Sequence, residues 1–142
     1  MKLVMDARAL NAFLRDEFAQ VAGMFDVMHV EPMQVQVRLR VNDSHLRPGG
    51  TVSGPAMFAL ADVSVYLATM AMIGPRALAV TTSCSMDFMR KPAAARDLIS
   101  ETRLLKLGRV LAVGDALMYS EGSADPVARA SMTYSIPPAP AG

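Results

Sequence analysis

One carboxylate stands alone in the most apolar stretch of the sequence, and it is the residue best placed for chemistry. Asp62 lies near the middle of residues 54–73, where the other polar side chains are Ser64, Tyr66 and Thr69. An isolated carboxylate is expensive to bury, so a functional role is favoured over a structural one. The structural alternative is an aspartate held by serine, threonine or backbone partners.

The stretch around Asp62 has the signals of one long helix. Ser53 is a good N-cap, Pro55 suits the first turn, and Gly74-Pro75 is a typical stop. A helix that is apolar on nearly all sides is either wrapped by protein or placed in a membrane. A carboxylate at the centre of a membrane span costs about 3 kcal/mol, and no cluster of Lys or Arg flanks the helix. We therefore expect a core helix and no membrane.

Composition narrows the class of protein further. The 142 residues are expected to form a single domain, 1–142, with 52% apolar and 19% charged residues. A net charge of +1 with scattered basic residues gives no electrostatic case for nucleic acid. The single cysteine, Cys84, cannot form an intrachain disulfide, and we interpret it as a small buried residue. The first residues lack the apolar core of a signal peptide, so a cytoplasmic location is predicted.

The remaining chain reads as one further helix and a set of strands. Helical spacing of apolar residues predicts an N-terminal helix over 7–22, and Gly23 is a plausible end. Alternating or β-branched runs predict strands at 25–30, 34–41, 78–89, 98–107, 109–119 and 127–136. Residues 137–142 are expected to be a loose C-terminal tail. Strands joined by short turns form an antiparallel sheet, which must bury one face. We predict an α+β fold with a curved antiparallel sheet wrapped around the 54–73 helix.

Two segments resemble a known family. Residues 49–55, Gly-Gly-Thr-Val-Ser-Gly-Pro, run into residues 58–62, Phe-Ala-Leu-Ala-Asp; residues 82–92 contain Met-Asp-Phe-Met-Arg before a basic, proline-containing turn. Together with the strand order they resemble the hotdog-fold thioesterases of the phenylacetic-acid-degradation type, over roughly residues 24–136. The resemblance implies a hotdog fold, with the 7–22 helix as an addition at the N-terminus.

The resemblance also implies a reaction and its residues. Such enzymes hydrolyse an acyl-CoA thioester to a free acid and CoA, with no metal and no cofactor besides the CoA of the substrate. By position, Asp62 is the general base or nucleophile, and the backbone N–H of Gly54 polarises the thioester carbonyl. Thr82 looks equivalent to the hydroxyl that positions the water or the carboxylate. Ser83 and Ser85 are the neighbours that could replace it.

The spacing of Gly54 and Asp62 adds a statement about assembly. Eight residues of helix separate them by about 12 Å, too far for both to act on one carbonyl carbon. If both work, Gly54 of one subunit must meet Asp62 of another, which requires at least a two-fold dimer. The family has this arrangement, and we expect a homodimer that assembles into a homotetramer.

The resemblance has departures that bear on the substrate. Ser53 and Pro55 flank Gly54 where many relatives have His-Gly-Gly, and Arg47 stands where an Asn is common. These departures imply an activity that is weak, altered or lost. The candidate substrate-binding residues are Ser53, His45, Arg47, Arg90 and Lys91, of which His45 and Arg47 lie in the polar loop of residues 42–50 that leads into the helix (the entry loop). Arg90 and Lys91, with Lys106 and Arg109 as second choices, are the candidates to meet the phosphates of CoA.

Two other functions stay open at this point. A non-catalytic acyl-CoA-binding module would use the same cavity without turnover. A hydratase or dehydratase of the same fold would pair the acid with a histidine, but the sequence places neither His29 nor His45 beside Asp62, and neither has metal-ligand spacing. The acyl group, aryl or short to medium alkyl, is not determined by the sequence.

Overall fold

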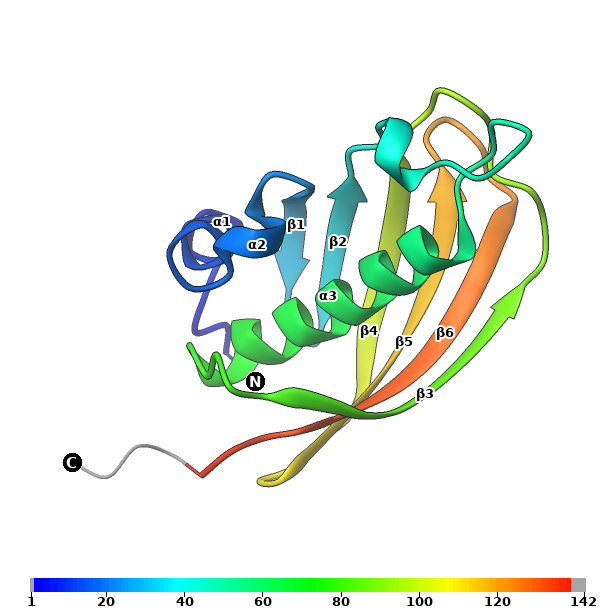
Figure 1. The fold of residues 1–142 in the computed structure, drawn as a ribbon. Helices are drawn as coiled ribbons and strands as arrows, with labels where there is room; N and C mark the ends of the chain where they lie inside the picture. Colours follow the sequence, from blue (N-terminus) through cyan, green and yellow to red (C-terminus); the bar gives the residue numbers. More distant parts are fainter. Residues whose placement is uncertain (1, 139–142) are drawn as a thin grey trace.

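A curved antiparallel sheet wraps around one long helix in the computed structural model, which describes residues 2–138 (Figure 1). The strand order is β1-β2-β4-β5-β6-β3, and all neighbours are antiparallel. The strands are β1 (Phe25–Glu31), β2 (Gln34–Leu39), β3 (Val80–Phe88), β4 (Leu98–Leu107), β5 (Leu111–Ser120) and β6 (Pro126–Ser135). This arrangement confirms the predicted hotdog fold.

The central helix α3 (Gly54–Ile73) lies in the concave side of the sheet (Figure 1). Ser53 caps its start by accepting a hydrogen bond from the N–H of Ala56, and Gly74 ends it with a φ of 86° that glycine adopts without strain. Its length and hydropathy would allow a membrane span, but 78% of the relevant window is buried inside the domain. That burial is typical of the core helix of a folded domain.

The N-terminal helix is shorter than predicted. Helix α1 (Ala7–Glu17) ends at Phe18, whose backbone (φ −134°, ψ 52°) is not helical, and a single turn, α2 (Ala19–Ala22), follows. The prediction of one helix over 7–22 is therefore wrong at this point. The break lets the Phe18 ring pack edge-on against Tyr66 of α3, with the ring centres 5.9 Å apart.

Side-chain hydrogen bonds fix α1 to the edge of the sheet. The Asn11 amide donates to the backbone oxygen of Val27 on β1, and its carbonyl accepts from the N–H of the same residue, at 3.1 and 2.9 Å. A register shift in the β1–β2 pairing begins at Val27, where these backbone groups are free to bond Asn11. These two hydrogen bonds therefore hold α1 against β1.

Two sequence-based expectations, a buried Cys84 and a loose C-terminal tail, can be compared with the structure. Cys84 is exposed rather than buried, because β3 lies at an edge of the sheet and most of its residues are uncovered. The predicted tail falls mostly on residues 139–142, which lie outside the described residues. Of its first two residues, Pro137 is held by a 3.1 Å hydrogen bond from the Arg76 guanidinium to its backbone oxygen.

Candidate active site

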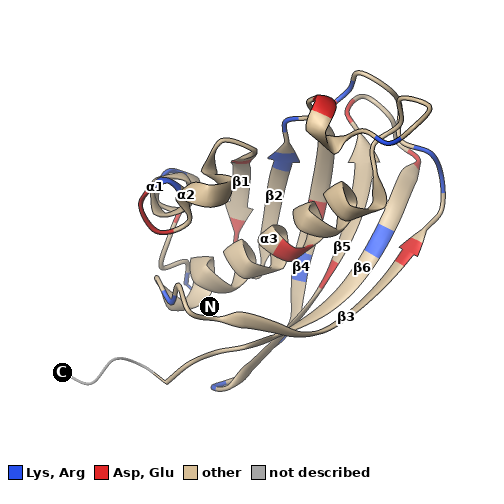
Figure 2. Cartoon of the chain, in the orientation of Figure 1, with Lys and Arg blue, Asp and Glu red and all other residues tan. Residues whose placement is uncertain are grey.

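Asp62 lies half-buried on α3, where two hydroxyl groups hold its carboxylate. Tyr134 of β6 donates to Oδ1 at 2.7 Å and lies 2.9 Å from the Asp62 backbone oxygen. Thr81 of β3 donates to the same Oδ1. Figure 2 shows Asp62 as the one acidic position along α3. Hydrogen bonds of this kind to a carboxylate are about twice as strong as neutral ones, so one oxygen is fixed while Oδ2 has no partner among the described residues.

The hydroxyl that reaches Asp62 is therefore that of Thr81 rather than Thr82. Thr82 donates instead to the backbone oxygen of Thr133, at 3.3 Å. The pairing of β3 with β6 shifts register between Thr81 and Ser83, so Thr82 is an extra residue in a bulge. Because a bulge interrupts the strict alternation of faces, counting along the strand points to the wrong threonine.

At the start of α3, the N–H of Gly54 has no acceptor among residues 2–138. Pro55 has no N–H, and the N–H of Ala56 is already bonded to Ser53 Oγ at 3.3 Å. Ser53 is therefore occupied as the helix cap, and Gly54 alone offers a free group. An unpaired N–H at a helix N-terminus is a suitable donor for a developing negative charge.

A pocket of about 420 Å³ opens beside Gly54 and gathers the predicted cations. Arg47 lines it from the entry loop, and Arg90 and Lys91 line it from the turn after β3. The Phe88 ring closes one side, so that a Cβ added at Gly54 would lie 3.4 Å from its Cζ. The structure thus brings three of the candidate substrate-binding residues to the helix N-terminus, although Arg90 also donates to the backbone oxygen of Pro126 at 2.8 Å.

The histidines do not take part in this arrangement. His45 is 7% exposed; its Nδ1 accepts from the N–H of Asn42, and its Nε2 lies 3.4 Å from the sulfur of Met24. The expectation that His45 contacts substrate is wrong, because the ring closes the short helix η1 (Asp43–His45) instead. His29 is exposed on β1 beside Glu31. Within residues 2–138, no group of three His, Cys, Asp or Glu side chains could hold a metal ion.

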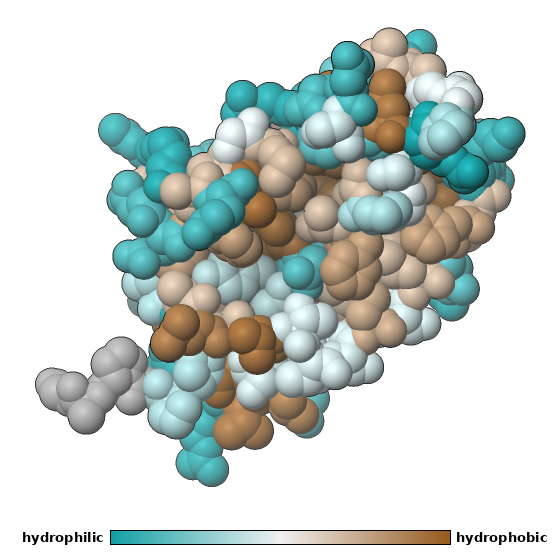
Figure 3. All heavy atoms as spheres, in the orientation of Figure 1, coloured by the Kyte–Doolittle hydropathy of each residue, from teal (hydrophilic) through white to brown (hydrophobic). Residues whose placement is uncertain are grey.

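The surface between α3 and β3 carries several partly exposed apolar side chains beside the serines and threonines of β3. Phe58, one turn before Asp62, is 39% exposed, and Phe88 and Met89 at the end of β3 are 55% and 45% exposed. Figure 3 shows this face as a mixture of apolar (tan) and weakly polar (white) residues. Cys84 shares the face: although the residue is exposed, partial burial of its thiol raises the pKa, and the nearby charge of Asp62 raises it further.

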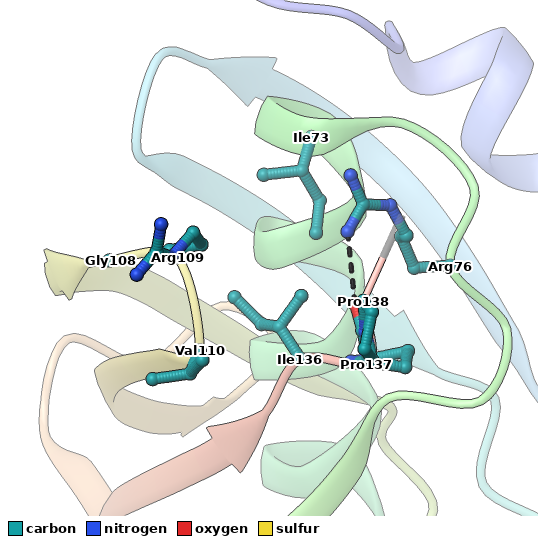
Figure 4. Close-up of a pocket in the computed structure, with 8 residues that line it drawn as sticks. All are labelled: Ile73, Arg76, Gly108, Arg109, Val110, Ile136, Pro137 and Pro138. Carbon is teal, nitrogen blue, oxygen red and sulfur yellow. Dashed lines mark hydrogen bonds between the residues drawn. The ribbon is translucent and has the colours of Figure 1, made fainter. Parts of the chain in front are cut away.

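A second pocket, of about 410 Å³, lies at the opposite end of α3 (Figure 4). Arg76 and Arg109 border it, and apolar side chains such as Ile73 and Ile136 form its floor. Its lining includes neither an acid nor a hydroxyl group. It offers no base or nucleophile, so the chemistry is better placed at Asp62.

Sequence reasoning missed Tyr134, which donates the second hydrogen bond to Oδ1 of the carboxylate. A signal was present: buried residues alternate along β6 at 128, 130, 132 and 134, and Tyr134 is the only member of that series with a hydroxyl. A buried tyrosine hydroxyl needs a polar partner. The identity of that partner follows only from the packing of α3 on β6.

This geometry belongs to a hotdog-fold domain with a carboxylate on its central helix and a free N–H at that helix's start. The sequence profile of the Thioesterase superfamily matches residues 49–127. A protein of Pseudomonas aeruginosa named "Putative esterase PA0474" is 32% identical over 108 residues, which are 76% of this chain and 81% of that protein. The chain belongs to the thioesterase superfamily.

Solved structures agree with this assignment. The crystal structure of a protein from Silicibacter sp. TM1040, described as a "putative thioesterase", has 58% identity and a TM-score of 0.91, covering 97% of this chain and 96% of that one. A point mutant of the phenylacetic acid degradation protein PaaI from Thermus thermophilus has 29% identity and a TM-score of 0.72, covering 84% of this chain and 99% of that one. Both the fold and the phenylacetic-acid-degradation type are confirmed, and thioester hydrolysis is supported as the class of reaction.

Proposed function

We propose that the protein hydrolyses an acyl-CoA thioester, with an aryl or short to medium acyl group, to the free acid and CoA without a metal ion. One observation carries this proposal: a carboxylate anchored through Oδ1, on the same helix as an N–H without an acceptor among the described residues. The first supplies a base or nucleophile and the second an oxyanion donor. Three cations beside that donor suit the phosphates of CoA.

The reaction balances with these groups alone. With Asp62 as general base, water attacks the carbonyl carbon and its proton passes to Asp62, while the oxyanion forms at the Gly54 N–H. The C–S bond then breaks, and the proton leaves with the CoA thiol. With Asp62 as nucleophile, the carboxylate displaces CoA thiolate to form a mixed anhydride, which water cleaves to the same products.

The site is proposed to be shared between two subunits. Gly54 and Asp62 of one chain are about 12 Å apart along the helix, whereas groups that act on one carbonyl lie about 3 Å from it. β3 lies at an edge of the sheet, and Phe58 beside Asp62 is partly uncovered, so a two-fold contact there would bring Gly54 of the partner subunit toward Asp62. A homodimer, paired into a homotetramer, is the assembly we propose, in the cytoplasm.

A thiol-release assay on a panel of aryl- and alkanoyl-CoA thioesters tests the reaction. We expect turnover that survives a metal chelator and falls about 100-fold or more in Asp62→Asn, as for removal of a group that takes part in proton transfer. Binding of CoA ligands without any turnover would favour the non-catalytic acyl-CoA-binding module instead. A hydratase or dehydratase is less consistent with this geometry, because His45 is buried against Met24 and His29 is exposed beside Glu31, and neither contacts the carboxylate.

A further inference from the structure

We infer that Tyr134 is a positioning residue that holds Oδ1 of Asp62 and leaves Oδ2 as the oxygen that acts on the substrate. This inference rests on the proposed function, since it assigns a role within the same site. It goes further by naming which carboxylate oxygen reacts and by tying the site to the N-terminal helix.

The contact between Tyr134 and Asp62 follows from the sheet register. Thr81 on β3 and Tyr134 on β6 are directly opposite one another, so their side chains project to the same face of the sheet. That face packs against α3, where both hydroxyls converge on Oδ1 of Asp62. A carboxylate oxygen with two donors cannot turn without losing both, so the direction of Oδ2 is fixed.

Tyr134 is suited to be a permanent donor. Its side chain is 3% exposed, and burial followed by the charge of Asp62 raises the pKa of its hydroxyl well above the usual range. The phenol therefore keeps its proton at any pH at which the protein works. A neutral hydroxyl beside a carboxylate donates rather than accepts.

An aromatic column connects this contact to α1. The Tyr134 ring lies 5.9 Å from the ring of Tyr66, which in turn lies 6.0 Å from Phe13 of α1 and 5.9 Å from Phe18. Tyr66 takes part in this column through its ring alone, and its hydroxyl donates elsewhere, to the backbone oxygen of Ala77 at 3.0 Å. The additional N-terminal helix thus acts as a support that holds the Tyr134 ring against Asp62.

Tyr134→Phe removes the hydroxyl and keeps the ring, and Tyr66→Phe is the matched control. We expect Tyr134→Phe to lower kcat about 10-fold or more, as for loss of a hydrogen bond to a charged group, with KM within about 2-fold. Tyr66→Phe deletes a hydroxyl that does not touch Asp62 and should leave kcat within about 2-fold. In an Asp62→Asn background, Tyr134→Phe should have no further effect on the residual rate, because it acts through the carboxylate.

Equal losses of kcat in the two tyrosine variants would overturn the inference, as would an undiminished effect of Tyr134→Phe in the Asp62→Asn background. A readout without substrate separates this result from the proposed function. The side-chain carboxyl ¹³C resonance of Asp62, assigned with Asp62→Asn, should move in Tyr134→Phe and stay in place in Tyr66→Phe. Wild-type protein without turnover would refute the proposed function alone, whereas a carboxyl resonance insensitive to Tyr134→Phe would refute the positioning role.

Discussion

Subunit complementation tests whether Gly54 and Asp62 act across a dimer. Gly54→Pro deletes the free N–H, and the local backbone accepts proline: Gly54 is the first helical residue, and Ser53 before it is extended at φ −77° and ψ 156°. No hydrogen bond is lost among the described residues, because the N–H has no acceptor there. Removal of one oxyanion donor costs about 10²- to 10³-fold in kcat, and Asp62→Asn removes the base or nucleophile.

Gly54→Pro and Asp62→Asn should each be nearly inactive when refolded alone, whereas a mixture of the two should recover activity. If the two variants are unfolded together in equal amounts and refolded, half of the dimers contain one chain of each kind. Each mixed dimer has one site with both native groups and one site with neither, so the mixture should recover about a quarter of wild-type activity. A site contained within one chain would have no intact copy in any dimer.

The refuting result is a mixture no more active than the average of its two parents. Wild type and each single variant, refolded in the same way, measure the yield of the procedure. Gly54→Ala controls for bulk: it keeps the N–H, and its Cβ would make an ordinary contact at 3.4 Å from the Phe88 ring. We expect Gly54→Ala to keep most of the kcat that Gly54→Pro loses, and a loss of equal size would assign the effect to volume.

Five further substitutions test the site and the helix that supports it. Thr81→Val should lower kcat about 10-fold by removing a donor to the Asp62 carboxylate, whereas Thr82→Val, one residue on, should leave thiol release unchanged. Phe13→Ala should lower the free energy of unfolding by about 3–5 kcal/mol, as for a buried phenylalanine, measured by urea denaturation. Arg47→Ala and Lys91→Ala should raise KM for a CoA thioester but not for the thioester of N-acetylcysteamine, which has no phosphates; equal effects on both substrates would exclude phosphate binding.

The sequence predicted the parts of the site that depend on one local segment. The bounds of α3 follow from Ser53 and Gly74, and the free N–H of Gly54 follows from its place at the helix start. Each of these features needs only the identity of neighbouring residues.

The two hydrogen bonds that hold the Asp62 carboxylate could not be predicted from neighbouring residues. Its two donors lie 19 and 72 residues further along the chain and meet it only because β3 and β6 pair in one particular register. The bulge at Thr82 shifts the face of every residue that follows it, and no local pattern of residue types marks a bulge among Thr81, Thr82 and Ser83. The prediction that His45 contacts substrate was wrong for a related reason. The burial of His45 depends on its contact with Met24 and on its role in capping η1, and the polarity of its loop does not reveal either.

The proposed dimer would also divide substrate binding from catalysis between its two subunits. Gly54 lines the same pocket as Arg47 and Lys91, so the chain that donates its N–H to a carbonyl also places its cations beside that substrate. In the proposed dimer, the Asp62 that acts on that substrate belongs to the other chain. In the mixed dimers, the chain carrying Asp62→Asn supplies the native Gly54 to the intact site. Lys91→Ala added to that chain should therefore raise KM of the recovered activity, and the same change on the Gly54→Pro chain should not. A KM that rises equally in both combinations would place the cations and Asp62 of one chain at the same substrate, and the division between subunits would be wrong.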